Sequence, residues 1–296
     1  MGRLEGKVAI VTGAGCVGSG WGNGRAMAVR FVEEGARVLA ADRDPARLAE
    51  TLERAGQTIR AAGGAVGGAV GGVAGGADSS AGNARGGASA AVMVAHECDA
   101  TDSASVKAMI EAAIKQFGRI DIMVNNVGGS AAGGPVEMSE EVWDAQIDFN
   151  LKSVFLGCKH VLPVMEAQGS GVIINVASTS GLRWTGAAQV AYAATKAAVM
   201  QLTRVVAVQY APKGIRVNCV VPGQLHTPMV EMRLAKQRAG GDVEALLASR
   251  RKRIPLGFMG DGRDTANAAL FLASDEAKFI TGTDIIVDGG MTARCD

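Results

Sequence analysis

A dense run of glycines between an apolar segment and a helical segment constrains the fold of this chain more than any other feature. Residues 7–12 form the short apolar run that is typical of a fully buried parallel strand. Six glycines fall within residues 13–24, and residues 25–34 then follow a helical pattern that stops at Gly35. A strand, a glycine turn and a helix in this order present backbone N–H groups to a pyrophosphate. The chain is therefore expected to open with a nucleotide-binding unit.

The next expected strand, residues 37–41, ends in an acidic residue, Asp42. A carboxylate at this position accepts hydrogen bonds from the ribose hydroxyls of NAD and repels the 2′-phosphate of NADP. Arg43 is the competing signal, because an arginine beside the strand end can bind that phosphate. We expect NAD as the cofactor, with NADP as the alternative.

Strand and helix patterns alternate along the rest of the chain. This alternation predicts an α/β fold with a doubly wound parallel sheet in a single domain, residues 1–296. The further expected strands are residues 91–95, 120–124, 172–176, 215–221 and 284–288. The further expected helices are residues 44–62, 104–117, 139–168 and 263–272, with one more after Tyr192. Ser103 is expected to cap the helix at 104–117, and Pro163 is expected to kink or end the helix at 139–168.

Two segments depart from this alternation. Residues 63–90 are almost wholly Gly, Ala, Val and Ser, so they have little side chain to bury and are expected to be a flexible inserted loop. Residues 228–256 are expected to form a helical lid over the substrate. The basic run from Arg250 to Arg253 in this lid is interpreted as a solvated helix end, with attraction of a phosphopantetheine carrier as the alternative.

Composition excludes several classes of protein. The 296 residues carry 30 basic and 29 acidic side chains, which leaves no electrostatic footprint for nucleic acid. Five scattered cysteines indicate neither a disulfide framework nor a metal site. No signal peptide and no apolar run of about 18 residues is present, which predicts a cytoplasmic protein that does not span a membrane.

Tyr192 and Lys196 carry the chemistry that this sequence predicts. Residues four apart on a helix share a face, so the phenol and the ammonium are expected to be neighbours. A fixed ammonium stabilises a phenolate and lowers the pKa of the phenol from about 10 toward working pH. Ser178 follows the strand at residues 172–176, where its hydroxyl can hold a substrate oxygen.

Together these motifs resemble the Tyr-dependent short-chain dehydrogenase/reductase family over nearly the whole chain. The resemblance implies a Rossmann-like fold, a catalytic tetrad of Asn150, Ser178, Tyr192 and Lys196, and an NAD-dependent interconversion of a secondary alcohol and a ketone. Tyr192 is the implied general acid/base, and Asn150 positions a water that relays protons from Lys196. Tyr192 and Lys196 also contact the cofactor, and the other implied cofactor contacts are Gly13, Gly15, Gly22, Gly24, Asp42, Arg43, Asp99, Ala100, Asn126, Val127, Gly128, Pro222, Gly223, Leu225 and Thr227.

The glycine turn is about five residues longer than the family pattern, which leaves open whether Gly15, Gly18 or Gly20 touches phosphate. Trp21 in this turn either covers the cofactor or packs on the surface, and surface packing is favoured. Val127 stands where the family carries a small alanine.

Residues beside the predicted tetrad are expected to line the substrate pocket. They are Ser130, Trp184, Gln189, Gln224 and His226. Their mixed character predicts a small alcohol or ketone without choosing one. The alternatives are an NADPH-dependent reductase of 3-oxoacyl-type ketones and a non-catalytic dinucleotide-binding sensor or scaffold. The resemblance also implies a homotetramer.

Overall fold

A computed structural model describes residues 2–61, 70–74, 91–234, 240 and 242–295. Eight parallel strands form one sheet in the order β3-β4-β2-β1-β5-β6-β7-β8. The strands are β1 (Val8–Thr12), β2 (Arg37–Asp42), β3 (Val70–Ala74), β4 (Met93–Glu97), β5 (Ile122–Asn125), β6 (Gly171–Val176), β7 (Ile215–Pro222) and β8 (Asp284–Val287).

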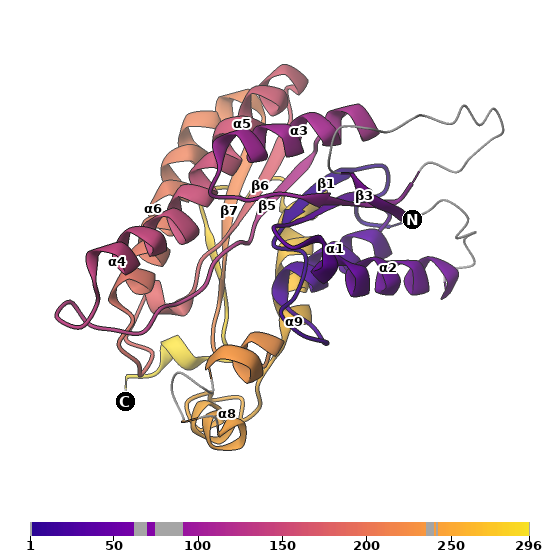
Figure 1. The fold of residues 1–296 in the computed structure, drawn as a ribbon. Coiled ribbons are helices and arrows are strands. Elements are labelled where there is room, and N and C mark those ends of the chain that lie inside the picture. The colour runs from indigo at the N-terminus through magenta and orange to yellow at the C-terminus, as the bar shows by residue number, and fades with distance from the viewer. Residues whose placement is uncertain (1, 62–69, 75–90, 235–239, 241, 296) are drawn as a thin grey trace.

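Helices cover both faces of the sheet, as Figure 1 shows. One apolar core joins the sheet to α3 (Ser103–Phe117), α5 (Ser153–Gln168) and α6 (Val190–Tyr210). The other joins it to α1 (Asn23–Glu33), α2 (Ala49–Ala61) and α9 (Gly262–Ala273). The predicted doubly wound, Rossmann-like sheet is confirmed.

The strand order reverses beside β1. The chain leaves β1 for β2 on one side, whereas β5 pairs with the other edge of β1. In open parallel sheets, a crevice forms outside the carboxyl ends of the strands at such a reversal, because the connections diverge to opposite faces. The glycine turn after β1 lies at this point.

The expected helix at residues 139–168 contains a change of helical type. It comprises α4 (Glu140–Ile147), a π-helical segment (Asp148–Lys152) and α5. Ser139 caps α4, and Asn150 is buried within the π-helical segment. Of the two outcomes expected at Pro163, the end of the helix does not occur, because α5 continues through it to Gln168.

The prediction that residues 63–90 form only a loop is wrong for part of that segment. Residues 70–74 form β3, which pairs in parallel with β4 at the edge of the sheet. Strand pairing uses backbone N–H and C=O groups, which a glycine-rich segment also carries, so the lack of side chains did not exclude a strand. Residues 63–69 and 75–90 lie outside the described residues.

Two helix starts also differ from expectation. The helix expected at 44–62 begins as a 3₁₀ turn (Pro45–Leu48) whose cap is Asp44. The cap of α3 is Asp102 rather than Ser103, since the Asp102 carboxylate accepts from the N–H of Ser105 at 2.7 Å. Capping thus moves by one residue in the second case and leaves both helices in place.

The expected lid region contains a π-helical turn (Val230–Leu234) and α8 (Val243–Arg251). Val230, Leu246 and Leu247 form a small apolar cluster that joins these two elements. Residues 235–239 and 241 of this region lie outside the described residues. Within the part of the chain that the structure describes, no helix is both long and apolar enough to cross a bilayer.

Candidate active site

A cavity of about 300 Å³ opens at the carboxyl ends of the strands, where the order reverses. It collects most residues that the sequence singles out, although they come from widely separated segments. Those that line it are Gly13, Gly15, Gly22, Gly24, Asp42, Arg43, Asp99, Ala100, Asn126, Val127, Gly128, Ser130, Ser178, Gln189, Tyr192, Lys196, Pro222, Gly223, Gln224, Leu225 and Thr227.

Two expected substrate residues lie away from the cavity wall. Trp184 is 76% exposed, because its loop turns the indole toward solvent. The imidazole of His226 is 45% exposed, and its Nε2 lies 2.8 Å from Oε1 of Glu231. Neither side chain is among the residues that line the cavity.

Lys196 is buried on α6, one turn after Tyr192, as the four-residue spacing predicts. Its ammonium lies 5.7 Å from the centre of the Tyr192 ring. Its Nζ also donates to the carbonyl oxygen of Val176 at the end of β6, at 2.9 Å. Removal from water lowers the pKa of Lys196 from 10.5 to about 8, with a smaller opposing effect from Cys219. The ammonium is therefore held in place at a cost in solvation.

This burial predicts a stabilising substitution. At pH 7 the shift in pKa corresponds to roughly 3 kcal/mol of desolvation cost, since each unit is worth about 1.36 kcal/mol. Lys196→Met without ligand is expected to raise the free energy of unfolding by about 1–3 kcal/mol, the lower end reflecting the lost bond to Val176.

The gain should depend on pH in a defined direction. Because the folded-state pKa of Lys196 is below its unfolded value, wild-type stability rises between about pH 8 and 10.5 as the folded protein releases this proton first. Denaturant unfolding of the wild type and of Lys196→Met gives the difference between their free energies of unfolding. This difference should be smaller at pH 10 than at pH 7. A loss of stability in Lys196→Met at pH 7 would contradict this account.

Asn150 lies behind the cavity wall rather than on it. Its Oδ1 accepts from the N–H of Gly129 at 2.9 Å, and its Nδ2 donates to the carbonyl oxygen of Gly129 at 3.1 Å. A Cβ at Gly128 would lie 2.9 Å from both Asn150 Oδ1 and Lys196 Nζ. Asn150 therefore fixes the loop after β5 so that the backbone of Gly128 passes closely beside the ammonium.

Ser178 follows β6 and adopts an extended backbone that starts a 3₁₀ turn (Thr179–Gly181). Its Oγ accepts from the N–H of Ser180 at 3.2 Å. Ser178 and Tyr192 both line the cavity. Beside it, the Gln189 amide donates to the hydroxyl oxygens of Ser180 at 2.7 Å and Thr185 at 3.1 Å. These bonds order one polar wall of the cavity.

The opposite end of the cavity is built from the glycine turn and the start of α1. Gly13 has φ of 63°, a backbone conformation that favours glycine, and no described side chain caps the N-terminus of α1 at Gly22. A Cβ at Gly24 would lie 1.9 Å from the carbonyl oxygen of Gly13. Asn126 donates to the carbonyl oxygens of Thr12 and Gly13, both at 3.1 Å, which ties the turn to the end of β5.

Asp42 connects the end of β2 to the glycine turn. Its Oδ2 accepts from the N–H of Gly15 at 3.1 Å and its Oδ1 from the N–H of Asp44 at 3.1 Å. Each carboxylate oxygen keeps a further lone pair for a ligand hydroxyl. Of the three glycines in question, Gly15 lines the cavity, whereas Gly18 and Gly20 do not.

Two arginines share this end of the cavity. Arg43 was expected there. Arg47 lies four residues later in the chain and was not predicted from the sequence. Burial would raise the pKa of Asp99, but hydrogen bonds from Thr101 and the positive charge of Arg43 outweigh it and hold the pKa below its usual range. Positive charge is thus present beside the acids of β2 and β4.

Several other lining residues carried no sequence motif. Cys16 and Val17 lie in the glycine turn, and Phe149 and Val230 lie in π-helical segments, whose geometry spacing does not encode. The interpretation of residues 250–253 as a solvated helix end is wrong for Arg250, which is 6% exposed and lines the cavity. It lies one turn after Leu246 on the face of α8 that packs inward, so the helix buries it.

The described residues include no group of three or more His, Cys, Asp and Glu side chains able to hold a metal ion. The donors that line the cavity are backbone N–H groups, the Lys196 ammonium, the guanidinium groups of three arginines, hydroxyls and amides. Such a set suits an anionic, hydroxyl-rich ligand.

Known proteins show the same sequence pattern and fold. The family described as enoyl-(acyl carrier protein) reductase matches residues 59–292. The chain is 37% identical over 288 residues to 2,5-dichloro-2,5-cyclohexadiene-1,4-diol dehydrogenase LinX from Sphingobium indicum, covering 97% of each. It is 38% identical over 294 residues to 3beta-hydroxysteroid dehydrogenase 1 from Eggerthella lenta, covering 98% of this chain and 95% of the relative. A crystal structure from Burkholderia xenovorans, described as a short-chain dehydrogenase/reductase, is 57% identical with a TM-score of 0.86 and full coverage of both chains.

Proposed function

Because this chain belongs to the short-chain dehydrogenase/reductase family and is an oxidoreductase, we propose that it interconverts a secondary alcohol and a ketone with NAD, using Tyr192 as general acid/base. One observation carries this proposal. A single cavity brings together Ser178, Tyr192 and Lys196 with the glycine turn and Asp42, although these residues come from four different segments.

The residues of the cavity fit a dinucleotide. The uncapped N-terminus of α1 and the glycine turn suit a pyrophosphate, and Asp42 suits the adenosine ribose. A side chain at residue 128 would crowd the Lys196 ammonium, so glycine keeps this group unobstructed at the cavity wall. When bound, the nicotinamide supplies the hydride acceptor or donor.

The protein's own groups then handle the proton and the substrate oxygen. The phenolate oxygen of Tyr192 accepts the alcohol proton in oxidation, and the resulting hydroxyl returns it in reduction. The buried ammonium of Lys196 favours the phenolate form by its charge. The hydroxyl of Ser178 donates to the substrate oxygen and aligns it with the phenol. Oxidation should therefore accelerate as the pH rises.

We propose NAD over NADP because Asp42 lies at the end of β2 with its carboxylate against the turn. Arg43 and Arg47 favour the alternative, since both line the cavity and can bind a 2′-phosphate. This observation, with the enoyl-(acyl carrier protein) reductase description of the matching family, keeps an NADPH-dependent reductase of 3-oxoacyl-type ketones as the second candidate.

Substitution of Asp42 by asparagine tests the choice of cofactor. Asparagine keeps an oxygen for the N–H of Gly15 but removes the negative charge, so the ratio of the NADPH Kd to the NADH Kd should fall by about tenfold or more. Fluorescence titration with both nucleotides measures this ratio. Glu53→Gln, an exposed charge removal on α2 away from the cavity, is the control and should leave the ratio almost unchanged. An unchanged ratio in Asp42→Asn would remove Asp42 as the selector.

The substrate is a small molecule, and its class is open to direct test. Relatives named for a cyclic diol and a hydroxysteroid suggest cyclic secondary alcohols as the first compounds to try. NAD reduction by the purified protein with a panel of cyclic, aromatic and linear secondary alcohols tests the proposed reaction. Reduction of NAD with the cyclic alcohols of the panel supports the proposed reaction. NADPH-dependent reduction of 3-oxoacyl thioesters alone would favour the second candidate.

We also propose a homotetramer built from single-domain subunits. Phe155 on α5 and Val205 and Val208 on α6 are exposed apolar side chains, and both helices cover the same face of the sheet. Exposed apolar side chains of this kind suit contacts with partner subunits. Light scattering of the purified protein should give four times the mass of one chain. A monomer would remove this proposal.

A further inference from the structure

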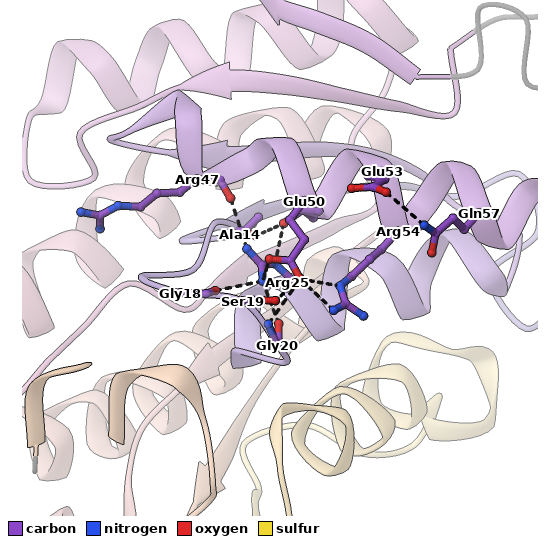
Figure 2. A network of polar contacts seen from close by, with 11 residues as sticks. Ala14, Gly18, Ser19, Gly20, Arg25, Arg47, Glu50, Glu53, Arg54 and Gln57 are labelled. Atoms are coloured by element: carbon purple, nitrogen blue, oxygen red, sulfur yellow. Dashed lines mark hydrogen bonds and ion pairs between the residues drawn. The ribbon is translucent and has the colours of Figure 1, made fainter. Parts of the chain in front are cut away.

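The lengthened part of the glycine turn, Gly18–Trp21, has no role in the site described above. Gly18 and Gly20 lie outside the cavity wall, whereas Cys16 and Val17, just before them, line it. Figure 2 shows this segment beside α2, at the centre of a network of polar side chains.

Arg25 is the centre of that network. Its side chain is buried, with the residue only 1% exposed, although an arginine in the first turn of a surface helix is usually solvated. Its Nη1 donates to the carbonyl oxygens of Gly18 at 3.2 Å and Gly20 at 2.8 Å, as Figure 2 shows. Its Nε donates to the hydroxyl of Thr51 at 3.1 Å, and this hydroxyl donates to the carbonyl oxygen of Ala14 at 2.8 Å.

Glu50 neutralises the buried guanidinium and holds the turn from the other side. Its Oε2 lies 2.7 Å from Nη1 of Arg25. Its Oε1 accepts from the hydroxyl of Ser19 at 3.2 Å, the N–H of Gly20 at 3.3 Å and Nε of Arg54 at 2.9 Å. Burial would raise the pKa of Glu50, but these bonds and the charges of Arg25 and Arg54 keep the pKa below its usual range. A buried cation requires such a partner.

The far side of the turn faces the lid region. A Cβ at Gly18 would lie 3.4 Å from Cβ of Pro228 and 3.6 Å from Cγ of Met232, and one at Gly20 would lie 3.3 Å from Cγ of Pro228. The backbone of the turn therefore rests against Pro228. Met229 and Val230, which follow Pro228, line the same cavity as Cys16 and Val17 of the turn.

Trp21 fixes the end of the segment. The guanidinium of Arg54 lies 4.4 Å from the centre of the Trp21 ring and that of Arg263 lies 5.8 Å from it. The carbonyl oxygen of Trp21 would be 2.7 Å from a Cβ at Gly262, so the first residue of α9 packs directly on the turn. Trp21 thus packs between two arginines rather than over the cavity.

We propose that Arg25 and Glu50 are positioning residues that hold Gly18–Trp21 against Pro228, so that the turn and the lid region enclose the bound dinucleotide from two sides. The proposal rests on the proposed function, because it assumes that the cavity binds a dinucleotide. By binding the carbonyl groups of Gly18 and Gly20, Arg25 fixes the backbone of the turn from the side of α2. Neither side chain touches the reacting atoms.

Loss of these residues should weaken dinucleotide binding and leave the chemical step intact. In Arg25→Met and Glu50→Gln the NADH Kd should rise by about tenfold or more, mainly through faster dissociation, because charge-assisted bonds that order the turn are lost. The kcat with saturating nucleotide should stay within about threefold. Arg25→Lys should recover part of the affinity, since lysine keeps the charge but lacks the fork.

Fluorescence titration and stopped-flow dissociation of NADH measure these effects, with thermal unfolding of each variant as the check on folding. Arg30→Met is the matched control, since Arg30 lies on the same helix and pairs at the surface with Glu33 and Glu34. Glu50→Gln is close to isosteric and serves if Arg25→Met does not fold. Unchanged NADH affinity and dissociation in Glu50→Gln would overturn the inference. A wild-type protein that binds neither nucleotide would overturn both this inference and the proposed function.

Discussion

Replacing Tyr192 with phenylalanine is expected to lower kcat by about 10²–10⁴-fold, the range that general acid/base groups contribute. The substitution removes only the hydroxyl, so the ring keeps its place beside Lys196 and the NADH Kd should stay within about threefold. Nicotinamide absorbance with the best alcohol of the panel gives kcat, and fluorescence titration gives the Kd. Loss of turnover with retained binding would separate the proton-transfer step from cofactor binding.

The chain supplies a matched control for this experiment. Its second tyrosine, Tyr210, ends the same helix, α6, and packs partly buried against the core away from the cavity. Tyr210→Phe should leave kcat within about twofold. If Tyr192→Phe retained wild-type kcat, Tyr192 would not be the acid/base group. A biological effect that persisted in Tyr192→Phe would favour the sensor or scaffold alternative.

Replacing Gly24 with alanine is expected to weaken NADH binding by about 10–100-fold and to lower stability by about 1–3 kcal/mol, as overpacking of a tight site does. The added methyl would lie 1.9 Å from the carbonyl oxygen of Gly13 and 2.6 Å from Nδ2 of Asn126. Since the first of these atoms is backbone, relief requires the turn to move away from the start of α1. The N–H groups that suit the pyrophosphate would then separate.

Gly18→Ala is the control, because its methyl would meet Pro228 and Met232 only at ordinary contact distances. It should change the NADH Kd by no more than about threefold. Titration and thermal unfolding of both variants compare the two positions within one turn. Equal effects at Gly24 and Gly18 would contradict the assignment of the Gly13–Gly24 contact to cofactor binding.

The layered architecture could be predicted from the sequence because each central strand is a buried apolar run that needs cover on both faces. The approach of Tyr192 to Lys196 was also predictable, since helical spacing determines it. The strand ends with Asp42, Asn126 and Ser178 meet in one cavity because parallel strands share a carboxyl edge.

Other features depend on contacts between distant segments, which spacing does not encode. β3 forms because β4 offers a free backbone edge, whatever the composition of its partner. The burial of Arg25, which lies on α1, depends on Glu50, which lies on α2. Trp184 and His226 flank the predicted tetrad in sequence, but their loops turn them outward. Of the five expected substrate residues, Ser130, Gln189 and Gln224 line the cavity, so position along the chain located only part of this set.

Titration of the purified wild-type protein with NADH and NADPH, followed by nicotinamide fluorescence, tests the central claim most directly. Both nucleotides should bind saturably at one site per chain, and NADH should bind more tightly than NADPH because of Asp42. Tighter binding of NADPH would transfer the selection to Arg43 and Arg47 and favour ketone reduction. Binding of neither nucleotide would contradict the claim that this cavity serves a dinucleotide-dependent oxidoreductase.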